Sequence, residues 1–338
     1  MTATVREMGP DLLASDLLGD AWSWMILRDA IFDGATRFEE FHQRLGIARK
    51  VLSKRLEKLT VSGLFLRRHV RQDSGHLEYV LTEMGRDFHP CLLTAQSWGD
   101  RWCSDRGNTT RRALHVPFGH SMEAVLCCSE CGHKLEAREV TVASVYRAST
   151  ESTGARRHRS PDLDLIERSQ ACSIARALRI IGDRWSSLIV RECFLGTRRF
   201  GEFEAHLGIA PNILASRLNR LVDLGVLVKT AYQNTPEPRQ YRLTEKGLDF
   251  YPVPLALLTW AGKWLSNGRP VIDLRHKPCG KHFVPVLTCA TCGERVGADD
   301  IAIEHIPLSN SAAHDTSLRV RASLPLHYRH GKLRSDSC

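Results

Sequence analysis

Cysteine and histidine at the spacing of metal ligands are the residues of this chain best suited to chemistry. His276 and Cys279 form one pair, nine residues follow, and Cys289 and Cys292 form a second pair. Each pair fits on one tight turn, and three thiolates with one imidazole make the closed tetrahedral ligand set of structural zinc. The spacing predicts a structural zinc ion in a ribbon-like segment over residues 272–304. The alternative is that these are buried, reduced cysteine pairs.

Part of the same ligand pattern occurs earlier in the chain. Three of the ligands recur 161 residues upstream, as His115, Cys128 and Cys131. Phe118 stands where the counterpart of Cys279 would be. His120 or Cys127 could supply a fourth ligand, although either would need a different loop path. Residues 112–146 are therefore predicted to form a degenerate ribbon that either binds zinc or is held by apolar packing.

Both ligand segments belong to a long internal repeat. Leu45–Ala48 returns as Leu207–Ala210, and Trp98 returns as Trp260, each 162 residues later. Self-similarity at a fixed, long period indicates a tandem duplication, here of a unit of roughly 130 residues.

The elements that position the ligands are read most easily in the second copy. Residues 202–207 have the apolar spacing of a short helix, Gly208 supplies a turn, and Pro211 opens an amphipathic helix. Two strands are predicted next, at 226–228 and 240–244. This is the order of a winged helix-turn-helix. The predicted fold class is mainly α with small β-hairpins (α+β): two tandem winged helix-turn-helix domains, each followed by a small zinc-ribbon-like module.

The helix that opens at Pro211 is predicted to enter the major groove of double-stranded DNA. Leu214, Leu218 and Leu221 lie on one side of it, so its polar residues point outward, where they can meet base edges. A basic hairpin can reach the adjacent phosphates. The residues expected to contact DNA are Arg49, Lys50, Ser53, Lys54, Arg55, Arg68 and Arg71 in the first copy and Asn212, Ser216, Arg217, Asn219, Arg220 and Arg239 in the second. A solvated charged face would explain one such helix, whereas two copies of the whole arrangement favour DNA binding.

The repeat and the stretches outside it set the expected domain boundaries. They are a first winged helix-turn-helix at 8–104, the degenerate ribbon at 112–146, a linker at 147–162, a second winged helix-turn-helix at 163–268, the zinc ribbon at 272–304 and a mobile basic tail at 305–338. The linker and the tail are rich in Ser, Arg and His and lack apolar periodicity, which is typical of mobile segments.

Several motifs of the second copy are specific enough to indicate a relationship. They are Gly182–Trp185, Arg199–Phe203, Gly208–Asn212, Leu214–Leu218 and Tyr241–Thr244. These motifs resemble the HxlR family of bacterial and archaeal transcription regulators, closely over 172–265 and more loosely over 11–102. The resemblance implies winged helix-turn-helix domains whose flanking helices build a homodimer on pseudo-palindromic operators. With two such domains, this chain could pair internally as a pseudo-dimer or with a second chain as a homodimer.

The resemblance also implies a possible role for Cys172. In the family, a cysteine at this position of the N-terminal helix can act as a redox or electrophile sensor. Arg168 and Arg176 each lie four residues away, and positive charge favours the reactive thiolate. The first copy has Gly9 at this place, so a sensor would be asymmetric. The alternative is that Cys172 is a small buried apolar residue.

Composition and charge narrow the function classes. Of the 338 residues 43% are hydrophobic and 25% are charged, no stretch would span a bilayer, and the N-terminus lacks the apolar core of a signal peptide. We therefore expect a cytoplasmic protein without a membrane partner, and a net charge of +9 agrees with a nucleic-acid partner. No HExxH, GxSxG, P-loop or GxGxxG motif occurs, so we do not expect an enzyme. The prediction is a DNA-binding regulator, open to control by an unknown effector or by redox. The alternative is an adaptor that binds proteins of the transcription machinery.

Overall fold

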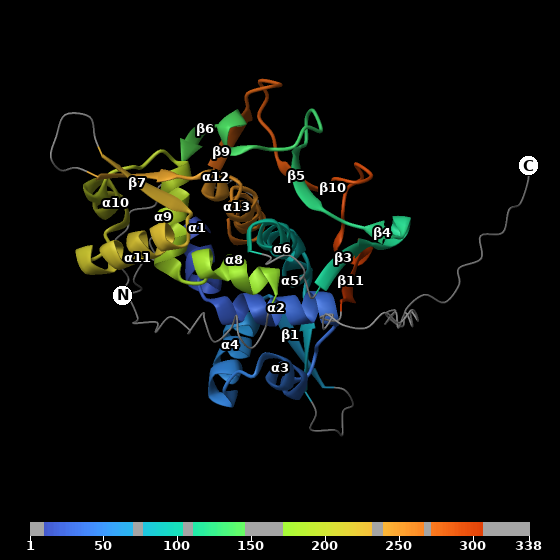
Figure 1. Ribbon diagram of the computed structural model, residues 1–338. Helices are drawn as coiled ribbons and strands as arrows, with labels where there is room; N and C mark the ends of the chain where they lie inside the picture. Colours follow the sequence, from blue (N-terminus) through green and yellow to red (C-terminus); the bar gives the residue numbers. More distant parts are fainter. Residues whose placement is uncertain are drawn as a thin grey trace, which may run out of the picture.

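The computed structural model describes residues 10–69, 77–103, 111–145, 172–231, 239–266 and 272–306. Helices fill the centre of the molecule and small pairs of strands lie around them (Figure 1). This architecture confirms the predicted fold class of helices with small β-hairpins. The predicted linker and nearly all of the predicted tail lie outside the described residues.

The two halves of the chain repeat one order of elements. The first half contains α1 Pro10–Leu18, α2 Ala21–Asp33, α3 Phe38–Leu45, α4 Arg49–Val61, β1 Phe65–His69, β2 Leu77–Leu81, α5 Glu83–Arg86 and α6 His89–Cys103. The second half contains α8 Ser173–Ile181, α9 Arg184–Phe194, α10 Phe200–Leu207, α11 Pro211–Asp223, β7 Leu227–Ala231, β8 Arg239–Leu243, α12 Glu245–Leu248 and α13 Pro252–Leu265. The strands pair antiparallel as β1–β2 and β7–β8, so each half carries the predicted helix, turn, helix and hairpin.

Local sequence signals set the ends of these helices. The Asp20 carboxylate accepts a hydrogen bond from the backbone N–H of Ser23 and caps α2, and Asp183 caps α9 in the same way. Gly46 and Gly208 end α3 and α10 with φ angles of 61° and 58°. Side chains strain this left-handed conformation, so glycine lets the chain turn sharply from the first helix of the motif into the second.

The two halves pack against each other through reciprocal contacts. Helix α1 of the first half packs on α13, α8 of the second half packs on α6, and α6 and α13 also touch. The indole N–H of Trp98 donates to the Lys246 carbonyl at 3.1 Å, and that of Trp260 donates to the Met84 carbonyl at 3.0 Å. Each residue of the first bond is the repeat counterpart of one in the second, so the interface is self-complementary like that of a two-fold dimer.

A second reciprocal pair extends this interface. Trp102 donates to the Asp249 carboxylate at 2.6 Å, and Trp264 donates to the Asp87 carboxylate at 2.8 Å. The crossing of α6 and α8 also depends on Gly99, because a Cβ there would lie 2.1 Å from a backbone oxygen of α8. The two halves therefore form an internal pseudo-dimer, one of the two pairings that the sequence left open.

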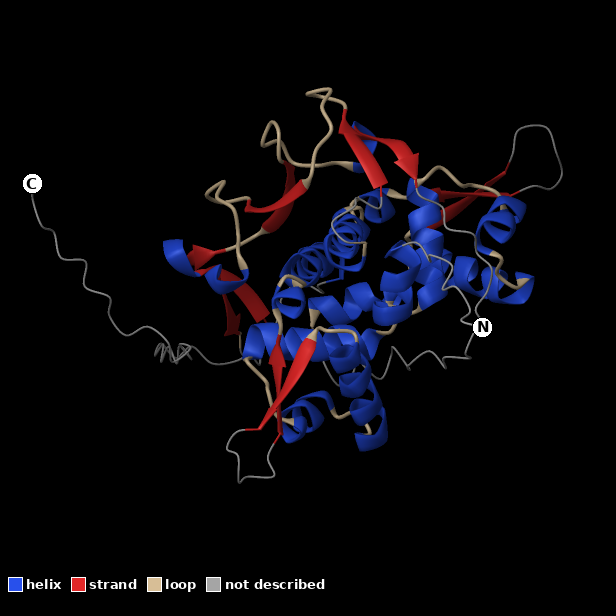
Figure 2. Cartoon of the chain, turned by 180° about the vertical axis from the view of Figure 1, so that it is seen from behind, coloured by secondary structure: helices blue, strands red, loops and turns tan. Residues whose placement is uncertain are grey.

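The segments that follow α6 and α13 form an arch of strands over one side of the helices (Figure 2). We call residues 111–145 and 272–306 the strand arch. It contains β3 Arg111–His115, η1 Val116–Phe118, β4 His120–Ser121, β5 Ala124–Cys128, η2 Ala137–Glu139, β6 Val140–Val145, β9 Ile272–His276, β10 Pro285–Cys289, η3 Ala298–Asp300 and β11 Ile301–His305.

Pairing within the strand arch runs mainly between the halves. Strand β10 pairs with β5, β11 with β3, and β9 with β6, all antiparallel. The sequence predicted two separate ribbons at 112–146 and 272–304, and the structure instead interleaves them. Two-stranded pieces of this length are marginal alone and expose unpaired edges, which the strands of the opposite half satisfy.

None of the helices in the described parts of the chain is both long and apolar enough to cross a membrane.

Candidate nucleic-acid interface and metal centres

The helices α4 and α11 present the polar faces that the sequence predicts. Lys50, Ser53 and Lys54 are exposed on α4, and Asn212 and Ser216 are exposed on α11. The opposite faces hold leucines that are fully buried: Leu52, Leu56, Leu59, Leu214, Leu218 and Leu221. Because the leucine faces fix the rotation of both helices, the polar faces are directed to solvent.

Two arginines predicted to contact DNA form ion pairs that hold these helices in place. Arg55 is buried, with Nε 3.0 Å from the Asp20 carboxylate. Arg217 has a side chain that is 22% exposed, with Nε 3.0 Å from the Asp183 carboxylate. Arg220 lies at 4.0 Å from the same carboxylate. The prediction is corrected for Arg55, because its guanidinium is used inside the fold.

Two more arginines predicted to contact DNA are exposed and pair with nearby carboxylates. Arg49 pairs with Glu39, and its guanidinium lies over the Phe38 ring at 5.3 Å. On the hairpin, Arg68 lies 3.4 Å from the Glu78 carboxylate with its side chain 67% exposed. Arg71 lies outside the described residues, and so does the side chain of Arg239.

The sequence did not lead us to predict Lys229, which connects strand β7 of the second hairpin to helix α11. Its ammonium group donates to the Asn219 side-chain oxygen at 2.7 Å and lies 5.8 Å from the centre of the Tyr241 ring. The sequence signal was available, because Lys229 is a basic residue on the first strand after α11. The contact places a positive charge next to the exposed polar face.

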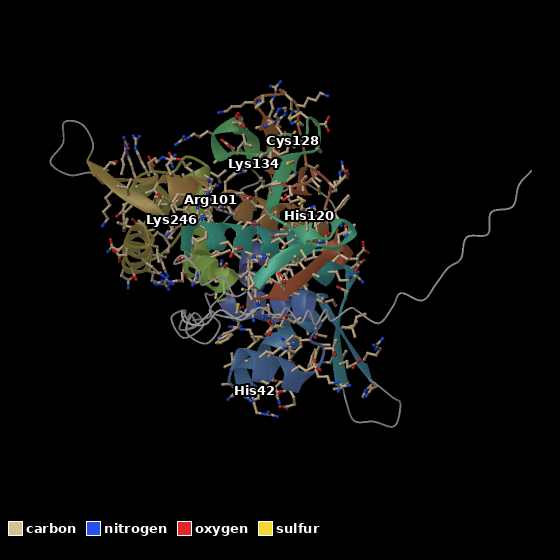
Figure 3. All side chains as sticks on the ribbon, turned by 45° about the vertical axis from the view of Figure 1, so that its right-hand side comes forward. His42, Arg101, His120, Cys128, Lys134 and Lys246 are labelled. Atoms are coloured by element: carbon tan, nitrogen blue, oxygen red, sulfur yellow. The ribbon has the colours of Figure 1, made fainter. Side chains whose placement is uncertain are left out.

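The strand arch gathers the predicted metal ligands into two clusters, in a combination that the sequence did not predict. One cluster is Cys128, Cys131, His276 and Cys279, and the other is His115, His120, Cys289 and Cys292. Within each cluster the ligand atoms all lie within 4.8 Å of one another. Each cluster takes two ligands from each half. Figure 3 labels Cys128 and His120 on the strand arch, away from His42 of α3.

The structure therefore corrects the predicted zinc site. His276 and Cys279 do not share a cluster with Cys289 and Cys292, because β5 pairs with β10 and brings the opposite halves together. The predicted set of His115, Cys128 and Cys131 is likewise divided between the two clusters. His120 lies with His115, Cys289 and Cys292, and Cys127 belongs to neither cluster. Phe118, which stands in place of a ligand, is half exposed with its ring 4.8 Å from the His115 ring.

Distances within the first cluster fit a tetrahedral ion. The Sγ atoms of Cys128 and Cys279 are 3.9 Å apart, and His276 Nδ1 lies 3.3 Å from Cys131 Sγ and 3.5 Å from Cys279 Sγ. Tetrahedral zinc with normal bond lengths requires about 3.8 Å between two sulfurs and about 3.6 Å between sulfur and nitrogen. His276 Nδ1 is therefore the nitrogen that faces the shared centre.

The second cluster has the same local design with two imidazoles. Cys292 Sγ lies 3.3 Å from His115 Nδ1, and both Cys289 and His115 are buried. Burial tends to raise the pKa of the Cys289 thiol, but the backbone N–H groups of Cys292 and Thr291 lower it below its ordinary value overall. The Lys281 N–H likewise lowers the pKa of Cys279 in the first cluster. Donors of this kind favour the thiolate that a metal requires.

Cys172 lies at the start of α8, inside the interface between the halves. It is only 6% exposed. Arg28 Nη1 lies 3.2 Å from its sulfur, and the same guanidinium is held by Asp29. Arg28 comes from the other half, so sequence spacing could not identify it. Arg168, the neighbour expected from the sequence, lies outside the described residues.

Comparison with protein families agrees with the helix-turn-helix order seen in both halves. The model of a family described as HxlR-like helix-turn-helix matches the chain twice, over residues 17–107 and 180–269. An uncharacterized HTH-type transcriptional regulator of Mycobacterium tuberculosis is 42% identical over 145 residues, which are 43% of this chain and 92% of the relative. YvaP of Bacillus subtilis, also named as an uncharacterized HTH-type transcriptional regulator, is 32% identical over 103 residues, covering 30% of this chain and 95% of its own. The crystal structure of PA1607, described as a candidate transcription factor, has 35% identity and a TM-score of 0.36, and covers 40% of this chain and 94% of its own.

Proposed function

The chain belongs to the HxlR-like helix-turn-helix family, and on this premise we propose that it is a sequence-specific DNA-binding transcription regulator. The observation that carries the proposal is the pair of exposed polar faces on α4 and α11, one on each half of the internal pseudo-dimer. Two helices related in this way suit an operator made of two half-sites. The chain would then bind as one molecule, in place of the homodimer that the family resemblance implies.

The two faces differ in charge, and we propose that α4 contacts mainly phosphates whereas α11 contacts mainly base edges. Lys50 and Lys54 on α4 are exposed cations suited to phosphates, which hold a protein on DNA without reading its sequence. Asn212 and Ser216 on α11 are neutral hydrogen-bonding groups suited to base edges. The operator would consequently be asymmetric, with the sequence requirement concentrated in the half-site that α11 contacts.

We also infer that the two ligand clusters of the strand arch hold structural zinc. The first cluster supplies three thiolates and one imidazole, and the second supplies two of each. Sulfur and imidazole donors in closed sets of four are typical of structural zinc, and neither set leaves a position for a substrate. Bound ions would fasten the two halves to each other, because each ion would take ligands from both.

Selection of bound fragments from genomic DNA tests the proposed function directly. We expect the full chain to enrich fragments that share one motif with two unequal half-sites, and we expect binding to weaken steeply as salt rises while discrimination between fragments persists. Uniform recovery of all fragments would contradict sequence-specific binding. If the chain prefers no DNA sequence but binds a protein of the transcription machinery, the result would favour the adaptor.

A further inference from the structure

An apolar cavity of about 400 Å³ lies between the second winged helix-turn-helix and the strand arch. Its walls include Phe194 at the end of α9, Tyr251 and Leu258 by α13, and Leu274 and Phe283 of the strand arch. Pockets for small molecules measure about 300–1,000 Å³ and are lined mostly by apolar and aromatic side chains. In size and lining, this cavity therefore suits an organic molecule.

At the equivalent place over the first half, polar contacts hold strands β3 and β11 against the helices. Asp33 at the end of α2 lies 2.8 Å from an Arg111 nitrogen on β3 and 3.2 Å from His305 Nε2 on β11. The ring of His89 lies 3.2 Å from the Val296 carbonyl oxygen. These contacts hold β3, β11 and the segment around Val296 against α2 and α6.

The second half has replaced the residues that make those contacts. The turn after α9 is one residue shorter and passes directly from Leu195 to Gly196, so Asp33 has no counterpart. Ile272 stands at the position of Arg111, and Tyr251 stands at the position of His89. Among the described residues, the counterparts of these three contacts are therefore missing over α9 and α13, where the cavity lies.

The charges around the cavity indicate the class of ligand. Arg191 and Lys263 are on its lining, and no acidic residue is among the described residues that line it. Arg191 lies 2.9 Å from the Glu192 carboxylate, and Lys263 lies 2.9 Å from the Asp87 carboxylate. Arginine has five N–H donors and lysine three, so both groups can donate to a second anion besides these carboxylates. The apolar walls and these donors together favour an apolar molecule that carries one negative group.

The cavity also contacts the elements that support DNA reading. Helix α9 lines it at its C-terminal end and is capped at its N-terminal end by Asp183, which holds Arg217 of α11. Lys263 bridges to Asp87 of the opposite half. A molecule in the cavity would therefore contact both α9, whose N-cap holds α11, and Lys263, which bridges the two halves.

We propose that this cavity binds an aromatic carboxylate or a similar apolar organic acid, which acts as the effector of the regulator. Ligand binding is independent of DNA, whereas the effector role rests on the proposed DNA-binding function. The matched probes are 1-naphthoate and 1-naphthylmethylammonium, which share a ring system and differ in the sign of their charge.

Isothermal titration calorimetry on the full chain tests the site. We expect 1-naphthoate to bind once per chain and the cationic probe to bind at least tenfold more weakly. Val142→Trp fills the cavity and should lower the naphthoate affinity at least tenfold, whereas Ile303→Trp, at the equivalent position of β11 over the first half, should leave it unchanged. Equal binding of both probes, or full naphthoate affinity in Val142→Trp, would overturn the site. So would the absence of naphthoate binding to the unaltered chain, a result that does not depend on how the variants fold.

The effector role needs a second measurement, on the DNA fragment selected above. Saturating 1-naphthoate should change the affinity for that fragment about fivefold or more, the lower end of ordinary allosteric coupling. Ligand binding without any change in DNA affinity would overturn the effector role and leave the site standing. Absence of specific DNA binding with and without the ligand would instead contradict the proposed function.

Discussion

Asp20 and Asp183 pair through their backbones as an antiparallel β-bridge between the two halves. Each also caps the helix that follows it, and each holds an arginine of α4 or α11 through its carboxylate. Arg55 of α4 and Arg217 of α11 are thus connected by a path of only four residues. The relative orientation of the two proposed reading helices depends on this path.

Removal of one aspartate should weaken both the fold and operator binding. In Asp183→Ala, α9 loses its cap and Arg217 loses a carboxylate partner, so we expect the free energy of unfolding to fall by about 1–3 kcal/mol. Urea denaturation measures this change, and operator affinity should fall as well. Asp223→Ala, at the exposed end of α11, is the control that should change neither quantity. Equal effects of both substitutions would contradict a special role for Asp183.

The interleaved ligand clusters lead us to expect a result that two separate ribbons would not give. His120→Ala should reduce the zinc content from two ions per chain to one, because His120 completes the cluster that contains Cys289 and Cys292. Elemental analysis of the purified chain measures the ratio. Cys127→Ser is the matched control, since Cys127 is buried beside Cys128 but belongs to neither cluster. Retention of two ions in His120→Ala would show that this histidine is not a ligand.

The proposed division between α4 and α11 predicts two distinct binding defects. Lys54→Ala should weaken binding to all sequences alike and reduce the slope of log affinity against log salt by about one. A double substitution, Asn212→Ala with Ser216→Ala, should chiefly lower the preference for the operator over unrelated DNA. Titrations at several salt concentrations separate these effects. Unchanged operator binding in both variants would show that neither helix contacts DNA.

Asp100 at the end of α6 should make stability depend on pH. Burial raises the pKa of its carboxyl to about 6, although Ser173 donates a hydrogen bond to it. The folded chain therefore holds this proton more tightly than the unfolded chain does, so this group favours folding at pH 4 and loses that contribution as pH rises through 6. In Asp100→Asn the loss should be absent, and thermal unfolding at pH 4 and pH 7 measures it. A similar pH dependence in Asp100→Asn and the unaltered chain would contradict this prediction.

Much of the fold follows from local patterns in the sequence. The helix that opens at Pro211 and the hairpin after it were predictable because leucine spacing, glycine turns and alternating strand residues act over a few positions. The same leucine spacing could have placed Arg55 correctly. It lies three residues after Leu52 and four before Leu59, both fully buried, so it shares their face of the helix.

The interleaving of the strand arch could not be predicted in this way. The spacing of Cys289 and Cys292 suits a zinc site shared with His276 and Cys279, and it suits a site shared with His115 and His120 equally well. The choice is made by β10 pairing with β5, a contact between residues far apart in the chain. The cavity depends on an equally subtle difference, the absence of one residue after α9.

The strand exchange also sets an order of events during synthesis. Cys128 and Cys131 emerge from the ribosome long before His276 and Cys279, and His115 and His120 long before Cys289 and Cys292. Neither ligand set can close until translation has passed most of the second half. If the clusters bind zinc as proposed, the thiols made first must stay reduced and without metal until the rest of the chain is made. Metal loading would then occur only after both halves have folded together.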